Sequence, residues 1–284
     1  MKKLFIVILA CCSLALAQYG YGVVAGAVIE ETENGAINYS QRIITATGIG
    51  AIPEYAVNAG QARAMAIRAA KADARRQLVE MVNGITLTSE TTMRNRMADE
   101  VVKESVSGVI TGAYQVGEVR YLSDTSVELT MAVSMSGISE VVTPVVGFAA
   151  TAPADVATAP VLTTTAVDPA AGVYTGIIID ARGLNVRPAM APKILDQNGS
   201  AVYGPGNYTR EYAVTNGVAG YSKTLEAARE DLRVKGNPLV LKASSVSGVN
   251  RTDVVVTNAD VIKINQANSA NNVLRDCRIL FLLD

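Results

Sequence analysis

An almost unbroken apolar run at the amino terminus is the most pronounced hydrophobic feature of the chain. Lys2 and Lys3 give a positive start, Leu4–Leu16 is nearly all apolar, and Ala15-Leu16-Ala17 places small residues at the two positions that signal peptidase reads. This pattern is typical of a secretory signal peptide, and the run is too short to span a bilayer as a stable helix. We predict a signal peptide over residues 1–17, cleaved between Ala17 and Gln18.

A second cleavage position lies inside the same leader. Ile8-Leu9-Ala10-Cys11 resembles a lipoprotein box, in which the cysteine becomes lipid-modified. Cleavage there would leave only Leu4–Ala10 as the apolar core, which is short for a signal peptide. Cleavage after Ala17 is therefore favoured over a lipid anchor at Cys11. It leaves Cys277 as the one mature cysteine, which cannot form an internal disulfide and is predicted to be a small buried side chain.

Residues 18–40 are predicted to form a flexible amino-terminal segment, because they begin with several glycines. An apolar stretch follows, and its candidate assembly residues are Val23, Val24, Val28 and Ile29. This stretch could form a short strand, packed either on its own domain or on the open sheet edge of a neighbouring molecule. Residues 30–35 are predicted to be an exposed turn.

The first compact domain is predicted over residues 41–139. A β-like run over residues 43–49 stops near Gly48, Gly50 and Pro53, and Asn58 is positioned to cap a long, alanine-rich helix that reaches about Val82. Gly48-Ile49-Gly50 resembles a dinucleotide-binding loop only superficially, since a third glycine and a following acidic residue are missing. A turn is the better explanation of these glycines.

The rest of the first domain contains the clearest strand signal. Apolar side chains alternate with polar or small ones from Ser126 to Met135, which is the two-residue period of a half-buried strand. Residues 116–122 are its predicted hairpin partner. A further β-like run is predicted over residues 85–87 and a helix over residues 93–104. A helix laid on one face of a mostly antiparallel sheet makes the predicted fold class α+β.

The composition changes after this domain. Residues 140–172 are rich in alanine, threonine and proline and are predicted to be a linker. A second, α/β or α+β domain is predicted over residues 173–284. Its expected strands include residues 175–180, 239–241, 254–256 and 279–283, with some parallel pairing. Ser222 is expected to cap a helix that ends at Gly236, and residues 259–275 are expected to be helical in part.

Charge and residue types exclude several classes of function. The formal net charge is −1 and the chain contains no histidine and no tryptophan. The absence of histidine excludes Ser-His-Asp and Cys-His catalysis and zinc sites made of histidine and cysteine. A near-neutral chain without a basic patch argues against nucleic acid as a partner. No catalytic residue, metal or cofactor is therefore assigned, and a non-enzymatic protein is expected.

One polar cluster remains as a candidate ligand site. Asp180 and Arg182 stand at the end of an apolar strand, and Arg187 follows in the same loop. Polar groups at a strand end can bind a ligand. They can equally pair with each other or with the backbone as the strand leaves the sheet, and this alternative is favoured.

The glycine-marked strand and the alanine-rich helix also carry a family resemblance. The stretch Ile44-Thr-Ala-Thr-Gly-Ile-Gly, the helix with Asp73-Ala74-Arg75 near its middle, and Val82-Asn-Gly-Ile-Thr-Leu resemble the Lpp-twenty-type bacterial lipoprotein domain. The same module is similar to parts of the flagellar P and flagellar T assembly proteins. The resemblance covers about residues 42–136 and implies an envelope-associated, non-enzymatic protein, with a flagellar role in the best-known relatives.

These observations predict an exported cell-envelope protein that is periplasmic, outer-membrane associated or extracellular. Its expected role is structural or in assembly, through contacts with other envelope proteins or with itself. No transmembrane segment is expected after signal cleavage. Two alternatives stay open: an extracellular subunit that polymerises by donating its amino-terminal strand, and a ligand-binding or enzymatic carboxyl-terminal domain.

Overall fold

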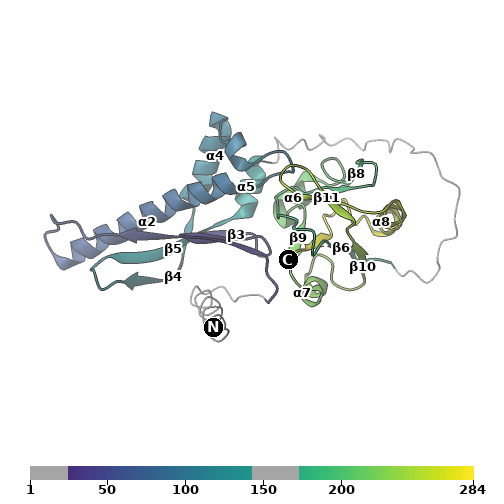
Figure 1. Cartoon of the computed structure of the whole chain (residues 1–284). Helices are drawn as coiled ribbons and strands as arrows, with labels where there is room; N and C mark the ends of the chain where they lie inside the picture. Colours follow the sequence, from purple (N-terminus) through teal and green to yellow (C-terminus); the bar gives the residue numbers. More distant parts are fainter. Residues whose placement is uncertain (1–24, 143–172) are drawn as a thin grey trace, which may run out of the picture. The chain divides into compact units, whose positions relative to one another are not determined.

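The computed structural model describes residues 25–142 and 173–284, which form two compact units (Figure 1). The first unit contains the residues up to Val141 except Leu87–Glu90, and the second contains Leu87–Glu90 together with the chain from Val142 to Asp284. Both units combine helices with sheets, so the predicted α+β class is confirmed. Within the described ranges, no helix combines the length and the apolar character needed to cross a membrane.

A five-stranded antiparallel sheet forms the base of the first unit. Its strands are β1 (Ile29–Thr32), β2 (Gly35–Asn38), β3 (Ile43–Gly50), β4 (Tyr114–Tyr121) and β5 (Val127–Ser134). They lie in the order β1-β2-β3-β5-β4. The predicted hairpin is confirmed as β4 and β5, and most residues of β5, including five in a row from Leu129 to Val133, are buried.

The prediction of a flexible segment over residues 18–40 is wrong for its described part. Ile29 pairs with Asn38 in the β1–β2 hairpin, and Val28 is buried. Most of residues 30–35, which were expected to form an exposed turn, belong to strands β1 and β2. Glu30 and Glu31 can face solvent within a strand, since β1 is at the edge of the sheet. Val28 and Ile29 thus pack on their own domain, and Val23 and Val24 lie outside the described residues.

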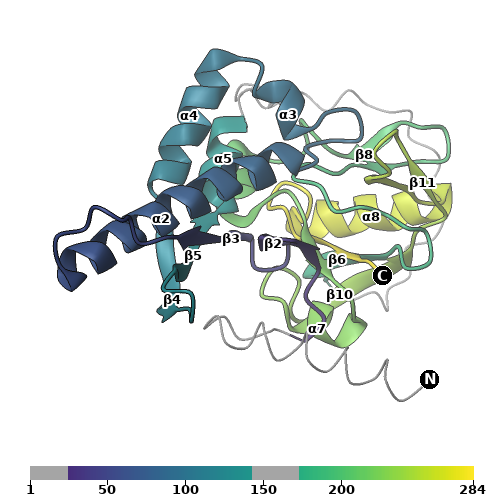
Figure 2. The same ribbon diagram turned by 60° about the vertical axis from the view of Figure 1, so that its left-hand side comes forward.

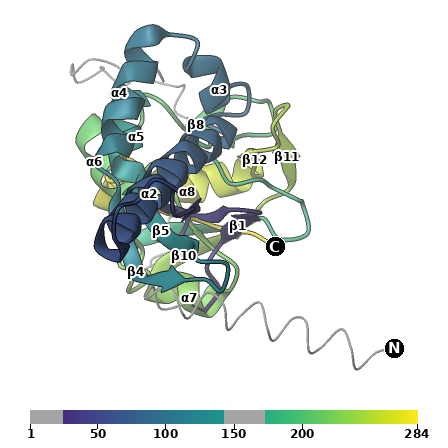
Figure 3. The same ribbon diagram turned by 90° about the vertical axis from the view of Figure 1, so that its left-hand side faces the viewer.

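A single long helix, α2 (Ala59–Gly84), lies along one face of this sheet (Figure 2). Figure 3 shows the helix foreshortened above strands β4 and β5. The predicted cap is confirmed, since the Asn58 side chain accepts a hydrogen bond from the Gln61 N–H at 2.8 Å. The buried face is made chiefly of small residues: Ala62, Ala66, Ala70, Ala74, Leu78, Met81 and Val82.

The backbones of α2 and β3 approach each other so closely that only glycine fits between them. A Cβ atom on Gly48 would stand 2.2 Å from the Ala70 carbonyl oxygen, and one on Gly50 would stand 2.1 Å from the Ala66 carbonyl oxygen. The turn predicted for these glycines is therefore wrong. They are part of β3, and what requires them is the helix that lies across the strand.

Asp73 fastens the helix to the same strand. Its Oδ2 accepts a hydrogen bond from the Ile49 N–H at 3.1 Å, and its Oδ1 lies 2.7 Å from Nη2 of Arg76. Partial burial alone would raise the pKa of the Asp73 carboxyl, but the hydrogen bonds from Arg76 and Ile49 outweigh this effect and lower it. The carboxylate is therefore ionised at neutral pH and holds both groups.

In the described residues, the first unit also has three shorter helices: α3 (Met93–Arg96), α4 (Glu100–Thr111) and α5 (Met135–Val142). Residues 93–104, predicted to be helical, are helical except for a break over residues 97–99, where Asp99 caps a second helix by accepting the Val101 N–H. The β-like run over residues 85–87 contributes only an isolated bridge between Thr86 and Thr92.

The second unit is built on two four-stranded sheets. One is fully parallel, with the order β10 (Pro238–Lys242), β6 (Gly176–Asp180), β13 (Ile279–Leu282) and β9 (Gly220–Ser222). The other has the order β11 (Ser245–Ser247), β12 (Asp253–Val255), β7 (Ile194–Leu195) and β8 (Ala201–Tyr203). The expected parallel pairing is thus confirmed.

From residue 173 onward, the second unit has three helices: α6 (Arg210–Asn216), α7 (Leu225–Glu230) and α8 (Asn258–Asn271). The cap predicted at Ser222 is wrong, because Thr224 accepts the Ala227 N–H, while Ser222 ends strand β9. The helix also stops at Glu230, well before Gly236, and leaves Leu232 90% exposed. Cys277 is buried, as predicted.

Residues Leu87–Glu90 take part in the hydrogen bonding of the second unit. The Leu87 carbonyl accepts from the Ala191 N–H at 2.8 Å, and the Ser89 carbonyl accepts from the Asn250 N–H at 3.0 Å. Asn250 Nδ2 also donates to the Thr88 carbonyl at 3.1 Å. The second unit is therefore discontinuous along the sequence.

Replacing Gly48 with alanine should destabilise the first unit by about 2–3 kcal/mol, since the new methyl group must push helix and strand apart. Gly108→Ala is the matched control. It lies inside α4, and a Cβ there meets no atom within 4 Å, so stability should rise by about 0.5–1 kcal/mol. Urea unfolding of the full chain measures both, and a Gly48→Ala variant as stable as the parent contradicts the packing argument.

Removing the Asp73 carboxylate should make the first unit less dependent on pH. The pKa of Asp73 is lower in the folded state than its unfolded value of about 3.9, so its contribution is complete at neutral pH and is lost as the pH falls through the folded-state value. Asp73→Ala should cost about 1 kcal/mol at pH 7 through the lost Ile49 hydrogen bond. Glu80→Ala, which removes an exposed partner of Arg76, should change little. Urea midpoints between pH 2 and pH 7 test this, and a parent-like midpoint for Asp73→Ala at pH 7 refutes it.

Candidate functional site

The carboxyl ends of the parallel strands bring polar residues to one edge of the sheet in the second unit. The strand register aligns one row of residues across all four strands: Lys242, Asp180, Leu282 and Ser222. The row before it is apolar except for one buried hydroxyl: Leu241, Ile179, Phe281 and Tyr221. In open α/β sheets, ligands bind outside the carboxyl ends of the strands. This edge is therefore the natural place to look for a site.

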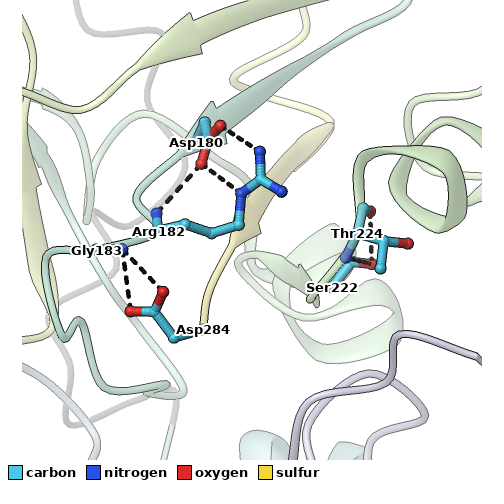
Figure 4. A network of polar contacts seen from close by, with 6 residues as sticks. All are labelled: Asp180, Arg182, Gly183, Ser222, Thr224 and Asp284. Carbon is cyan, nitrogen blue, oxygen red and sulfur yellow. Dashed lines mark hydrogen bonds and ion pairs between the residues drawn. The ribbon is translucent and has the colours of Figure 1, made fainter.

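Asp180 and Arg182, the first two predicted ligand residues, pair with each other at this edge (Figure 4). Arg182 Nε donates to Asp180 Oδ1 at 2.9 Å, and Nη2 donates to Oδ2 at 2.6 Å. The Arg182 backbone N–H also donates to Oδ1 at 3.2 Å. The structure thus shows the pairing that the sequence offered as the alternative to ligand binding.

The pair holds both groups in their charged forms. The hydrogen bond from Arg182, reinforced by the charge of Lys242, lowers the pKa of Asp180 despite partial burial. The hydrogen bond and charge of Asp180 raise the pKa of Arg182, and the charges of Glu226 and Asp284 add to this effect. Groups that stay ionised near neutral pH are suited to fixing a geometry rather than to transferring protons.

Two further polar residues lie at the same edge and were not predicted. The Asp284 carboxylate accepts the Gly183 N–H at 2.8 and 3.1 Å, and Ser222 Oγ donates to the Thr224 carbonyl at 3.1 Å (Figure 4). Asp284 lies just beyond the strand predicted over residues 279–283, so applying the strand-end argument to that strand would have found it. Ser222 ends β9, a strand that was not predicted, and the sequence therefore offered no such signal for it.

Arg187, the third predicted ligand residue, lies further along the loop that follows β6. Its backbone N–H donates to the Arg251 carbonyl at 2.9 Å. Arg251 in turn donates from Nη2 to the Leu184 carbonyl at 2.7 Å and from Nε to the Asn185 carbonyl at 3.3 Å. An arginine that binds backbone carbonyls in this way fixes the course of the loop.

A second candidate site lies at one end of the first unit, where several large apolar side chains are exposed. Four of them come from the end of β3 and the connection to α2, which projects at the left of Figure 1, and one comes from the end of β4. We call this set the apolar tip; it consists of Ile49, Ile52, Tyr55, Val57 and Tyr121. Tyr55 is 74% exposed and Val57 is 85% exposed.

The strand register explains why these residues share one end of the unit. Gly50 and Tyr121 both pair with Val127, from opposite sides of β5. The guanidinium carbon of Arg63, near the start of α2, lies 5.2 Å from the centroid of the Tyr121 ring. The end of β3, the start of α2 and the end of β4 therefore meet. Residues 50–57 lack any helical or strand period, so no pattern in the sequence predicts this cluster.

The residues that the structure describes contain no group of three or more histidine, cysteine, aspartate or glutamate side chains that could hold a metal ion. The two candidate sites also differ from each other in chemical character. The carboxyl edge is a network of polar groups bonded to one another, and the apolar tip is an exposed hydrophobic surface. Neither assembles a nucleophile with a general base.

The comparisons with known proteins concern the second unit. Residues 176–284 match the family described as Treponema pallidum Tp0624, second domain. The matched range begins at the first residue of β6 and contains the whole parallel sheet with its polar edge. No match was found among curated proteins. The resemblance of residues 42–136 to Lpp-twenty-type domains lies outside the matched range and stays a prediction.

The Asp180–Arg182 pair should behave as one structural element. Asp180→Asn and Arg182→Gln should each lower the urea midpoint of the second unit, and the double variant should lie close to the lower of the two, because each change removes the same interaction. Arg229→Gln, an exposed change on α7, is the control and should have little effect. Additive losses in the double variant would show that the two side chains act independently.

Proposed function

We propose that this chain is an exported, non-enzymatic cell-envelope protein with a structural or assembly role through protein–protein contacts. The observation that carries the proposal is the apolar tip. Soluble proteins seldom expose large apolar side chains side by side, and where they do, the patch commonly marks an interaction site. Tyr55 and Val57 are 74% and 85% exposed, on the loop between β3 and α2.

Other observations support this proposal. The leader over residues 1–17 has the features of a secretory signal peptide, which favours a periplasmic, outer-membrane associated or extracellular location. The Lpp-twenty-type resemblance of residues 42–136 agrees with an envelope role, and its flagellar relatives make flagellar association part of the proposal. Asp180 and Arg182 are engaged with each other rather than poised for chemistry.

Assembly by donation of a strand has less support. One edge of the first sheet is β1, which carries Glu30 and Glu31, and charged residues on an edge strand discourage pairing with another chain. The other edge is β4, which has a bulge between Val116 and Arg120 and a left-handed Gly117. Contacts through the apolar tip do not require either edge to open.

Ligand binding by the second unit is the other candidate. It is favoured by one observation, namely that the polar row of the parallel sheet lies where α/β sheets bind ligands. The mutual pairing of the polar groups counts against it, because a ligand would have to displace these hydrogen bonds or bind outside them.

A triple change of the tip, Ile52→Ser, Tyr55→Ser and Val57→Ser, should leave folding intact and abolish function. Exposed positions of this kind usually change stability by less than about 0.5 kcal/mol each. The assay is complementation of a gene deletion, scored by envelope integrity, motility and surface structures. The control is Leu232→Ser with Val249→Ser, two exposed apolar positions of the second unit.

The triple variant should fail to complement although it unfolds at the parental urea midpoint, and the control should complement fully. Mass spectrometry of the mature amino terminus checks export in the same cells, with Gln18 expected as the first residue. Full complementation by the triple variant, or turnover of a small substrate by the purified chain, would refute the proposed function.

A further inference from the structure

We infer that the second unit has a binding groove for a peptide loop, and that Leu87–Glu90 of a second copy of this chain can enter it in place of the molecule's own segment. This inference rests on the proposed function, because it names a second copy as the partner in an assembly role. We call residues 85–93 the exchange loop and the residues that contact its tip the groove.

The groove binds the main chain of the exchange loop. The carbonyl groups of Leu87, Thr88 and Ser89 each accept one hydrogen bond. Ala191 donates its N–H to the first at 2.8 Å. Asn250 donates Nδ2 to the second at 3.1 Å and its N–H to the third at 3.0 Å. Main-chain hydrogen bonds of this kind give affinity in peptide recognition, and the side-chain positions give specificity.

Two side-chain positions of the loop are restricted. Leu87 is 1% exposed and Ser89 is 4% exposed. A Cβ atom on Gly248 would stand 2.2 Å from the Ser89 Cβ, so the main chain of the groove lies directly against this serine. The groove therefore fits a loop with an apolar residue followed, two positions later, by a small one.

Hydrogen bonds within residues 176–284 shape the groove. The Tyr221 hydroxyl donates to the Ala189 carbonyl at 2.7 Å and accepts from the Ala189 N–H at 3.0 Å, two residues before Ala191. The Arg251 N–H donates to the Gly248 carbonyl at 3.1 Å, which closes the turn that carries the other two donors. These bonds do not involve the exchange loop, so they hold the donors in place for whichever loop arrives.

The exchange loop is likewise closed by its own contacts. At its base the Met93 N–H donates to the Ile85 carbonyl at 2.8 Å, and Thr86 forms an antiparallel bridge with Thr92. Both contacts join residues of the first unit. The shape of the loop at its base therefore does not depend on the groove.

A loop and a groove that are shaped separately can meet within one molecule or between two. Thr88 and Asn250 are 162 positions apart in the sequence, so no local segment obliges them to come from the same copy. Exchange of an identical element between copies preserves every contact and is a low-cost route to assembly. In dilute solution a molecule's own loop has the advantage of a high effective concentration, and a dense array of copies reduces that advantage.

The test uses two complementary variants of the full chain. Ser89→Tyr makes the loop too large to lie against Gly248 and leaves the groove intact. Asn250→Asp replaces the Nδ2 donor with an oxygen that repels the Thr88 carbonyl and leaves the loop intact. The matched control for the second variant is Asn207→Asp, the same change at an exposed position of the second unit. Leu87→Ser serves as a second loop variant, and urea unfolding verifies that all variants fold.

Each variant alone should sediment as a monomer, and the equimolar mixture of Ser89→Tyr with Asn250→Asp should form dimers at concentrations up to about 1 mM. Hydrogen exchange at the Ala191 N–H should be about tenfold faster in Ser89→Tyr alone than in the parent, and the mixture should restore the protection. The mixture of Ser89→Tyr with Asn207→Asp should stay monomeric, because the intact loop of the control remains in its own groove.

A monomeric mixture with Ala191 unprotected would overturn this inference. Dimers of either variant alone would also overturn it, since they would form through another surface. If neither loop variant folds, the loop is an indispensable part of the second unit and the inference fails as well. None of these outcomes decides the proposed function, which the triple change of the tip tests separately.

Discussion

The contact between the backbones of α2 and β3 determines how the first unit is built. Gly48 and Gly50 present no side chain, and the facing residues of the helix are Ala66, Ala70 and Ala74. Helix and strand can therefore touch along several turns, at separations that a larger side chain would prevent. Dispersion between the packed backbones is gained over the whole length of the contact. The hydrogen bond from the Ile49 N–H to Asp73 fixes the position of the helix along the strand.

The exposed tip lies at one end of this contact. The chain leaves β3 at Gly50 and enters α2 at Ala59, and Ile52, Tyr55 and Val57 of this connection are exposed. Its apolar side chains then have little to pack against. The guanidinium of Arg63 lies over the Tyr121 ring at the same end of the unit.

Much of the fold could be predicted from the sequence, and the exceptions have physical causes. The capped helix from Asn58 and the β4–β5 hairpin have strong local signals, a side-chain cap and a two-residue period. The role of Gly48 and Gly50 could not be read locally, because their requirement comes from a helix more than ten residues away. Strands β1 and β2 are short and have glycines nearby, so their sequence gives no clear strand signal. Their pairing is stabilised by the sheet.

Only some residues of the candidate sites could be predicted from the sequence. Asp180 and Arg182 were found because a strand end has a sequence signature, whereas Asp284 joins them only through tertiary structure. The apolar tip has no signature, since nothing in residues 50–57 says whether a tyrosine will be covered. Solvent exposure is a property of the completed fold, and it depends on what the neighbouring elements leave uncovered.

The discontinuity of the second unit bears on how such domains are inherited. Leu87–Glu90 supply carbonyl groups to the Ala191 and Asn250 N–H groups, yet the range shared with the Treponema pallidum domain starts only at residue 176. A gene segment transferred by recombination at that boundary would carry the parallel sheet but not these acceptors. The recipient protein would have to satisfy the Ala191 N–H and both the backbone and side-chain donors of Asn250 with its own chain or with water. The range matched by the family therefore leaves out residues whose hydrogen bonds belong to the second unit.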